Sequence, residues 1–163
     1  MATTYTPIAT TTLGSAQASV TFSSISGSYT DLVLVVNGQA ATSQQIALQF
    51  NSDTGSNYSV TSLYGDGTSA ASGRTTSQTA MFGAFGWFGN GTQSTSIIQI
   101  QNYSNTTTYK TAIGRGNLSS NYVHAGVGLW RSTSAITSIY IYVNGGYNWT
   151  SGTTFTLYGI TAA

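Results

Sequence analysis

The stretch SIYIYV at residues 138–143 is the clearest structural signal in this sequence. Successive side chains of a β-strand point to opposite faces, so residues two apart share a face. The aliphatic members of this stretch therefore share one face and its tyrosines the other: Ile139, Ile141 and Val143 against Tyr140 and Tyr142. Such alternation is typical of a strand that covers a core on one side only.

Comparable runs recur along most of the chain and are separated by Gly, Asn and Ser. Val, Ile, Thr, Tyr and Phe are enriched in strands, whereas Gly, Asn and Ser favour the turns between them. Apolar residues at the spacing of a helix face are absent. The predicted strands cover residues 17–25, 31–37, 45–50, 58–64, 78–88, 95–103, 108–114, 124–131, 136–144 and 153–160.

Many short strands with Gly and Asn turns predict an all-β fold, an antiparallel, jelly-roll-like β-sandwich of nine to ten strands. We expect one β-sandwich domain over residues 14–163. The Thr-rich segment 1–13, with Pro7, precedes the first confident strand and is either an extended N-terminal arm or a frayed terminus. Residues 65–80 lack large apolar side chains and are predicted to form a long loop.

The chain is almost without charge. Charged residues make up 4% of the sequence, against about 25% in average proteins. The net charge of +1 comes from four scattered cations and three acids, which gives no basis for binding nucleic acid. No apolar run reaches the roughly 18 residues that a membrane span needs. The first residues lack the pattern of a signal peptide, so we expect incorporation into an assembly rather than secretion.

Catalytic groups are scarce, and we expect no enzyme activity and no cofactor. There is no cysteine, and His124 is the only histidine, so a zinc site is not expected. The three acids are Asp31, Asp53 and Asp66, and only a pairing of the last two could serve glycoside hydrolysis. His124 lies in YVHAGVGLW without a nucleophile motif. We expect its ring to lie in or beside a strand, bonded to a neighbour.

The decapeptide FNSDTGSNYS at residues 50–59 has amide or acid side chains at alternate positions. A calcium-binding EF-hand loop needs Gly at position 6 and Glu at position 12, and counting from Asn51 these positions are Ser56 and, beyond the decapeptide, Ser62. Asp53 remains a weak calcium candidate. We favour a tight turn between two strands, in which Asp and Asn bond their own backbone and Gly55 takes a positive φ.

Two Gly-rich segments carry large aromatic side chains, GAFGWFGNG at 83–91 and GGYNWTSG at 145–152. Aromatic rings next to glycines either pack closely on a neighbouring backbone or subunit, or offer a platform to a sugar. The candidates for ligand or subunit contact are Trp87, Phe88, Tyr147 and Trp149.

Three segments resemble a pattern found in small virion proteins of tailed bacteriophages, many of which infect cyanobacteria. They are SGSYTDLVLVVNG (26–38), ALQFNSDTGSNYSVTSLYGDG (47–67) and QNYSNTTTYKT (101–111). The decapeptide is the most distinctive part of the match, which covers about half of the chain. Gln49 stands where the pattern often has a basic residue, so an ion pair from that position is missing here.

This resemblance implies a β-sandwich in a symmetric virion assembly, without catalysis. Because no shaft of repeats is visible, the leading hypothesis is a capsid decoration (cement) protein on the capsid surface, in contact with the major capsid protein or other virion proteins. We expect it to self-associate as a homotrimer. The alternative is a tail-fibre or receptor-binding module that recognises host glycans.

Overall fold

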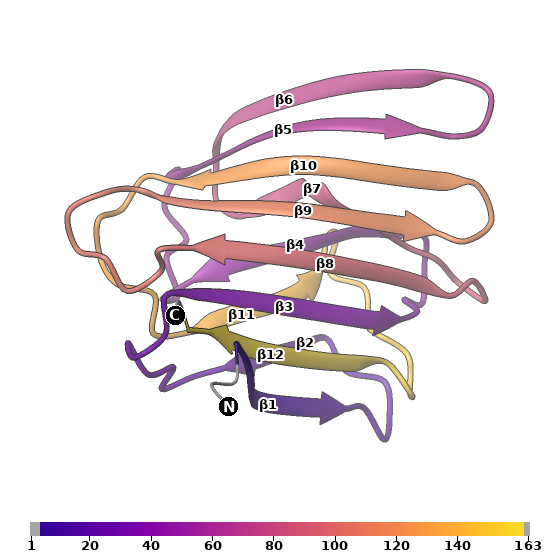
Figure 1. Cartoon of the computed structure of the whole chain (residues 1–163). Helices are drawn as coiled ribbons and strands as arrows, with labels where there is room; N and C mark the ends of the chain where they lie inside the picture. The colour runs from indigo at the N-terminus through magenta and orange to yellow at the C-terminus, as the bar shows by residue number, and fades with distance from the viewer. Residues whose placement is uncertain (1–3, 162–163) are drawn as a thin grey trace.

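A computed structural model describes residues 4–161, which form two antiparallel β-sheets packed face to face (Figure 1). The larger sheet has eight strands. In spatial order they are β1 (Tyr5–Thr12), β12 (Thr154–Ile160), β3 (Asp31–Gly38), β8 (Ser94–Gln101), β9 (Lys110–Leu118), β10 (Tyr122–Trp130), β5 (Tyr58–Gly65) and β6 (Ala70–Gln78).

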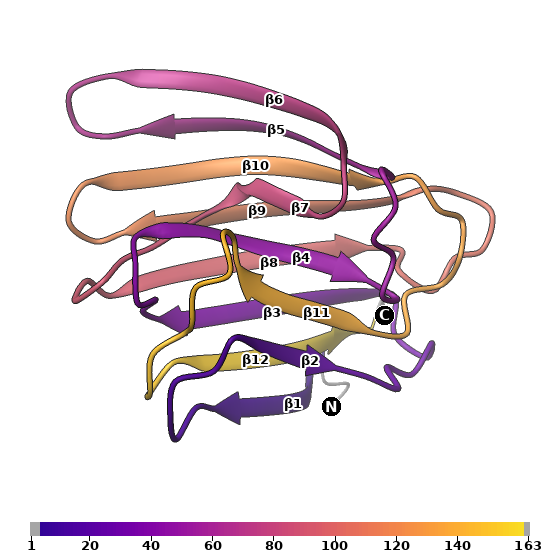
Figure 2. The same cartoon turned by 180° about the vertical axis from the view of Figure 1, so that it is seen from behind.

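The smaller sheet has four strands and covers only part of the larger one. Its spatial order is β2 (Ser19–Phe22), β11 (Ile139–Val143), β4 (Gln44–Phe50) and β7 (Met81–Phe88). Seen from behind, β5 and β6 extend past β7, which is the edge of this sheet (Figure 2). The described residues include no helix, and therefore none that could cross a membrane.

The predicted all-β sandwich is confirmed, with twelve strands within residues 4–161 instead of the nine or ten expected. Each of the ten predicted strands overlaps an observed one. The segment expected to be an N-terminal arm instead contains β1, whose Tyr5–Thr12 pair with β12 at the edge of the large sheet. The predicted loop 65–80 contains β6, which pairs with β5. Residues 1–3 of the expected arm lie outside the described part of the chain.

The core lies between the two sheets and follows the expected alternation. Ile139, Ile141 and Val143 of β11 are fully buried, and the rings of Tyr140 and Tyr142 pack on each other on the opposite face, with centroids 5.3 Å apart. Burying each such aliphatic side chain stabilises the fold by about 1.5–3 kcal/mol. The burial of β11, with that of the other three strands of its sheet, therefore holds the smaller sheet on the larger one.

Strand β7 lies directly against the inner side of β9 and β10 because glycines occupy the facing positions. A Cβ added at Gly116 would lie 2.4 Å from the carbonyl oxygen of Phe85, and one at Gly126 would lie 2.6 Å from that of Ala84. Both distances are shorter than real Cβ contacts. The expected close packing of the segment 83–91 on another backbone is confirmed. The glycines that allow it belong to the opposing strands.

This close approach can be tested with one methyl group. Gly126→Ala should lower the free energy of unfolding by about 1–3 kcal/mol, because the added carbon has no space beside Ala84. Urea denaturation measures the change.

Gly73→Ala in β6 is the matched control, since the nearest atom to its new carbon lies 3.9 Å away. That variant should stay within about 0.5 kcal/mol of the parent. Equal losses in the two variants would contradict close packing of β7 as the cause.

Candidate functional site

The decapeptide 50–59 is the crossover that leads from β4 in the small sheet to β5 in the large one. The carboxylate of Asp53 accepts hydrogen bonds from three donors. They are the indole Nε1 of Trp130 at 2.7 Å, the amide of Asn57 at 2.9 Å and the backbone N–H of Gly55 at 2.8 Å. The expected bonding of Asp53 to its own turn is confirmed, and the bond to Trp130 joins the crossover to β10.

The backbone of the turn differs from the expectation. The positive φ angles belong to Asn51 (52°) and Ser52 (57°), and Gly55 is not among the residues with positive φ. The Asn51 side chain explains part of this conformation, because it accepts hydrogen bonds from the backbone of Thr137 and Ser138 and donates one to Ala135. It therefore ties the crossover to the segment that leads into β11.

Tyr58 completes the crossover. Its hydroxyl accepts a hydrogen bond from the backbone N–H of Phe50 at 3.0 Å and donates to the carbonyl oxygen of Asp53 at 3.1 Å. Its ring stacks on Trp130, with centroids 6.3 Å apart and planes at 15°. Burial strongly raises the pKa of Tyr58, so this hydroxyl keeps its proton and remains a donor throughout the neutral range.

The pKa of Asp53 is lowered. Burial raises it, but the hydrogen bonds from Trp130, Asn57 and Gly55 together outweigh burial because they stabilise the charged form. The described residues contain no group of three or more acidic, His or Cys side chains placed to hold a metal ion. Both oxygens of Asp53 are used inside the protein, and its observed role is to hold the crossover.

Of the four aromatic candidates for ligand or subunit contact, two belong to the core. Phe88 and Trp149 are fully buried and pack edge to face, with ring centroids 4.9 Å apart. Trp149 packs in the same way on Phe155 at 5.1 Å. The expectation of contact from these two is therefore wrong. Bridges from Trp149 to Gln17 and Ala40 draw its loop into the sandwich.

The other two candidates reach the surface. Tyr147 is 41% exposed in the turn after β11. Trp87 is half-buried on β7, and its ring stacks on that of Tyr122 with centroids 6.0 Å apart. For Tyr147 and Trp87, contact with a ligand or a subunit stays a prediction.

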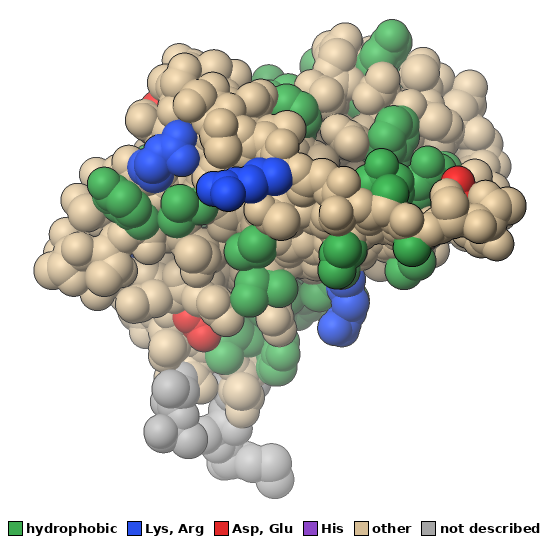
Figure 3. Space-filling model, turned by 90° about the horizontal axis from the view of Figure 1, so that it is seen from above, with side chains coloured by type: hydrophobic (Ala, Val, Ile, Leu, Met, Phe, Trp, Pro, Cys, Tyr) green, Lys and Arg blue, Asp and Glu red, His purple; other side chains and the backbone are tan. Residues whose placement is uncertain are grey.

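The outward face of the large sheet is a surface that the sequence did not reveal. Large apolar side chains from three adjacent strands are exposed on it: Leu63 (64%), Val123 (64%), Ile113 (46%) and Val127 (41%). We call the outward side of the large sheet the outer face, defined by these four residues with Ile97, Arg115 and Ala125. Seen from above, the molecule also shows hydrophobic side chains in groups, among a few Lys, Arg and acidic side chains (Figure 3).

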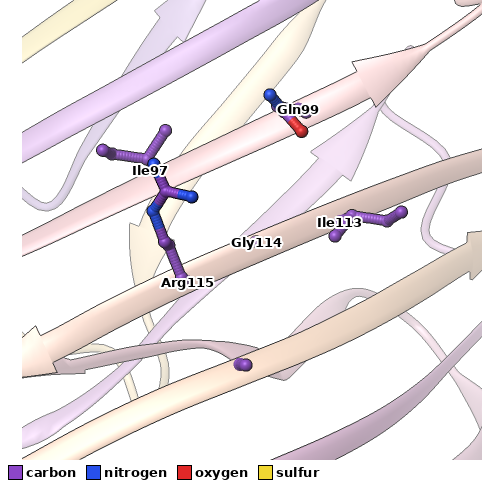
Figure 4. A pocket seen from close by; sticks show the side chains of 6 residues that line it. Ile97, Gln99, Ile113, Gly114 and Arg115 are labelled. Carbon is purple, nitrogen blue, oxygen red and sulfur yellow. The ribbon is translucent and has the colours of Figure 1, made fainter.

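Arg115 stands in the middle of the outer face. Its strand β9 lies between β8 and β10, and its side chain extends toward Ile97 of β8 (Figure 4). A hollow of about 240 Å³ beside it is lined by Ile97, Gln99, Ile113, Gly114, Arg115 and Ala125. The hollow is shallow and mainly apolar, with one cation and one amide at its border, which suits contact with another protein surface.

The glycines of β9 and β10 are the one feature of the sequence from which the outer face could have been predicted. In β9 and β10 the inward positions include Gly114, Gly116, Gly126 and Gly128. An alternation of small and apolar residues usually places the apolar residues in the core. Here β7 occupies the core side, so the apolar residues of these two strands point outward.

His124 lies in β10, as expected. Its side chain points to the inward side of the sheet and is only 2% exposed. The expected hydrogen bond to a neighbour is absent, because neither ring nitrogen has a partner among the described residues. Its ring packs edge to face on Tyr64, with centroids 5.6 Å apart. Burial lowers the pKa of His124 below its ordinary value of 6.5, so the ring stays neutral at neutral pH.

No protein-family model matches this sequence, and no curated protein matches it. Among solved structures, the chain is similar to the galectin LEC-6 of Caenorhabditis elegans, with a TM-score of 0.38 and 10% identity over 87% of this chain and 92% of that one. It is also similar to the alginate lyase Aly36B, with a TM-score of 0.34 and 12% identity over 93% and 77%.

A PL-14 alginate lyase from Aplysia kurodai gives a TM-score of 0.36 and 9% identity over 94% and 81% of the two chains. Similarities of this size carry no argument about activity or ligand.

Acid should weaken the fold through His124. Between pH 6.5 and the lower pKa of the folded state, the unfolded chain binds a proton that the buried ring does not. Stability should therefore be constant above pH 6.5 and fall as the pH drops below it. Urea midpoints between pH 8 and pH 5 measure this dependence.

The control is His124→Phe, which keeps an aromatic ring at the site. Because His124 is the only histidine, the urea midpoint of this variant should be flat over the same pH range. An unchanged slope in the variant would contradict the assignment.

Proposed function

We propose that this protein is a non-enzymatic structural component of a phage virion, a capsid decoration protein that stabilises the assembled shell. The observation that carries the proposal is the outer face, where Leu63 and Val123 are each 64% exposed on a sheet with very few charges. Exposed apolar groups clustered on one face mark an interaction surface. A protein with so little charge gains solubility by being covered in an assembly.

The acids support a structural role, because each one holds a loop. Asp31 accepts a hydrogen bond from the backbone N–H of Asn102 at 2.6 Å. Asp66 accepts from the backbone of Thr68 and Ser69 at 2.9 and 2.7 Å. Asp53 binds Trp130. These carboxylates act as acceptors that fix loops, which is the use expected of Asp in turns.

The resemblance to phage virion proteins supports a location in the virion. Its most distinctive segment is the crossover 50–59, which joins the two sheets. Gln49, which replaces the often basic residue of the pattern, donates its amide to the carbonyl oxygen of Thr79 at 2.9 Å. A neutral hydrogen bond thus stands where relatives could use an ion pair. The segment that carries the resemblance belongs to the framework of the fold.

The proposed action is adhesive. A decoration protein that binds only the assembled shell stabilises the shell by mass action, without chemistry. The outer face would cover capsid subunits, and a homotrimer would place three copies around a symmetry axis of the shell. The alternative, a tail-fibre module that recognises host glycans, predicts a different position in the particle.

Cryo-electron microscopy of the intact phage particle tests the proposal directly. We expect density for this chain on the capsid surface in icosahedral copy number, with the outer face against capsid subunits. Density confined to the tail tip would overturn the capsid location and favour the alternative.

Val123→Lys should remove the protein from purified particles, because it replaces one of the most exposed apolar side chains of the outer face with a charge. Thr21→Lys, at an exposed position of β2 in the opposite sheet, is the matched control and should leave occupancy unchanged. Equal occupancy for the two variants would contradict the outer face as the contact. Light scattering reports the oligomeric state, and a stable monomer at micromolar concentration would contradict the trimer.

A further inference from the structure

Arg115 is a cation without a partner on the apolar outer face. Its side chain is exposed on the outward side of β9, and its guanidinium forms no hydrogen bond or ion pair with any described residue. Its nearest outward neighbours on the adjacent strands and along β9 are all uncharged: Ile97, Ala125, Ile113 and Asn117. Among the described residues, nothing beside Arg115 neutralises its charge.

The acids of the chain are used elsewhere. Asp31, Asp53 and Asp66 accept hydrogen bonds that hold loops, and none of them is among the residues that define the outer face. A second copy of the outer face would bring another arginine and no acid against Arg115. The outer face is therefore unsuited to contact with itself, and the expected self-association would use another surface.

Two hollows flank Arg115 on the outer face. One has a volume of about 240 Å³ and extends to Ile113, and the other has a volume of about 250 Å³ and extends to Asn117. Arg115 and Ile97 line both hollows. Outward positions two residues apart on a strand are about 6.6 Å from each other, so the hollows lie side by side. A partner can place apolar side chains in them while a polar group meets the guanidinium between them.

The charge of Arg115 restricts what that polar group is. Taking a charge out of water costs free energy unless a partner of opposite charge is supplied. A purely apolar surface would therefore be repelled by Arg115. A carboxylate fits best, because it accepts two parallel hydrogen bonds from the planar guanidinium. Nucleic acid is disfavoured, since binding to phosphates needs several clustered cations.

We propose that the partner of the outer face is an apolar protein surface that places the carboxylate of an Asp or Glu against Arg115 and apolar side chains in the two hollows beside it. This inference rests on the proposed function, because the partner is then a surface of the assembled shell. It adds the chemistry by which that surface is recognised.

Arg74 provides a comparison at the edge of the same side of the sheet. Its exposed side chain points outward, because Arg74 pairs with Thr61 of β5, and Thr61 pairs with Val127 of β10. Val127 in turn pairs with Ile113 of β9. Arg74 thus lies three strand spacings from β9, about 14 Å, on the edge strand of the large sheet. A charge at the edge of a contact stays hydrated and contributes little to affinity.

Rebinding of purified protein to phage particles that lack it tests the charge of the partner. Arg115→Met removes the cation and keeps an unbranched side chain. We expect it to raise the Kd about thirtyfold or more, because the carboxylate of the partner would be buried without a cation. The Kd of the parent should also rise more steeply with salt than that of Arg115→Met, because salt screens the ion pair.

Arg74→Met is the matched control and should change the Kd less than about threefold. Both positions are exposed, and melting of each variant checks that the fold is kept. A partner without an acid gives the opposite sign, since Arg115→Met would then bind more tightly than the parent. That result, an unchanged Kd in Arg115→Met, or equal losses in the two variants would overturn the proposal.

Val123→Lys separates this inference from the decoration role. If Val123→Lys loses binding while Arg115→Met does not, the outer face is the contact and only the acidic partner is wrong. A parent protein that does not rebind at all would overturn the decoration role and this inference with it.

Discussion

The hydrogen bond between the Asp53 carboxylate and the Trp130 indole ties the crossover between the two sheets to the end of β10 in the large sheet. Asp53 lies in the only segment that carries the chain from β4 to β5, and Trp130 ends β10 beside β5. The indole is 2% exposed, and a buried donor without an acceptor costs about 1–3 kcal/mol. Tyr58 and Asn51 then fix the same segment to the ends of the neighbouring strands. A turn that could have been a metal loop is thus the corner of the sandwich.

The second constraint is the close contact of β7 with β9 and β10. Glycines on the inner side of β9 and β10 let the backbone of β7 approach theirs. The large apolar residues of β9 and β10 therefore lie on the outward side of the sheet. One packing solution therefore creates both a tight core and an exposed apolar face. The proposed decoration role follows from that face.

Most of the fold could be predicted because most strands cover the core on one side. The alternation of aliphatic and tyrosine side chains in residues 138–143 reflects burial on one side of the strand. β6 escaped prediction because nearly all of its side chains are exposed, so no alternation is imposed on them. β1 escaped prediction because it is an edge strand with mainly polar residues.

Trp149 was wrongly predicted to reach a ligand or subunit because its loop folds inward through backbone bridges. Such bridges leave no trace in local composition. The outer face depends on strand register and on the packing of β7 against β9 and β10, and neither is a property of one segment.

The corner is tested most directly by a double-mutant cycle between Asp53→Asn and Trp130→Phe, with free energies of unfolding from urea denaturation. If the carboxylate and the indole bind each other as described, the two changes should be coupled by about 1.5–3 kcal/mol, the value of a hydrogen bond to a charged group. Asp53→Asn should then cost much less in the Trp130→Phe background than in the parent. Additivity within about 0.5 kcal/mol would contradict the account, since it would mean that the two side chains stabilise the sandwich independently.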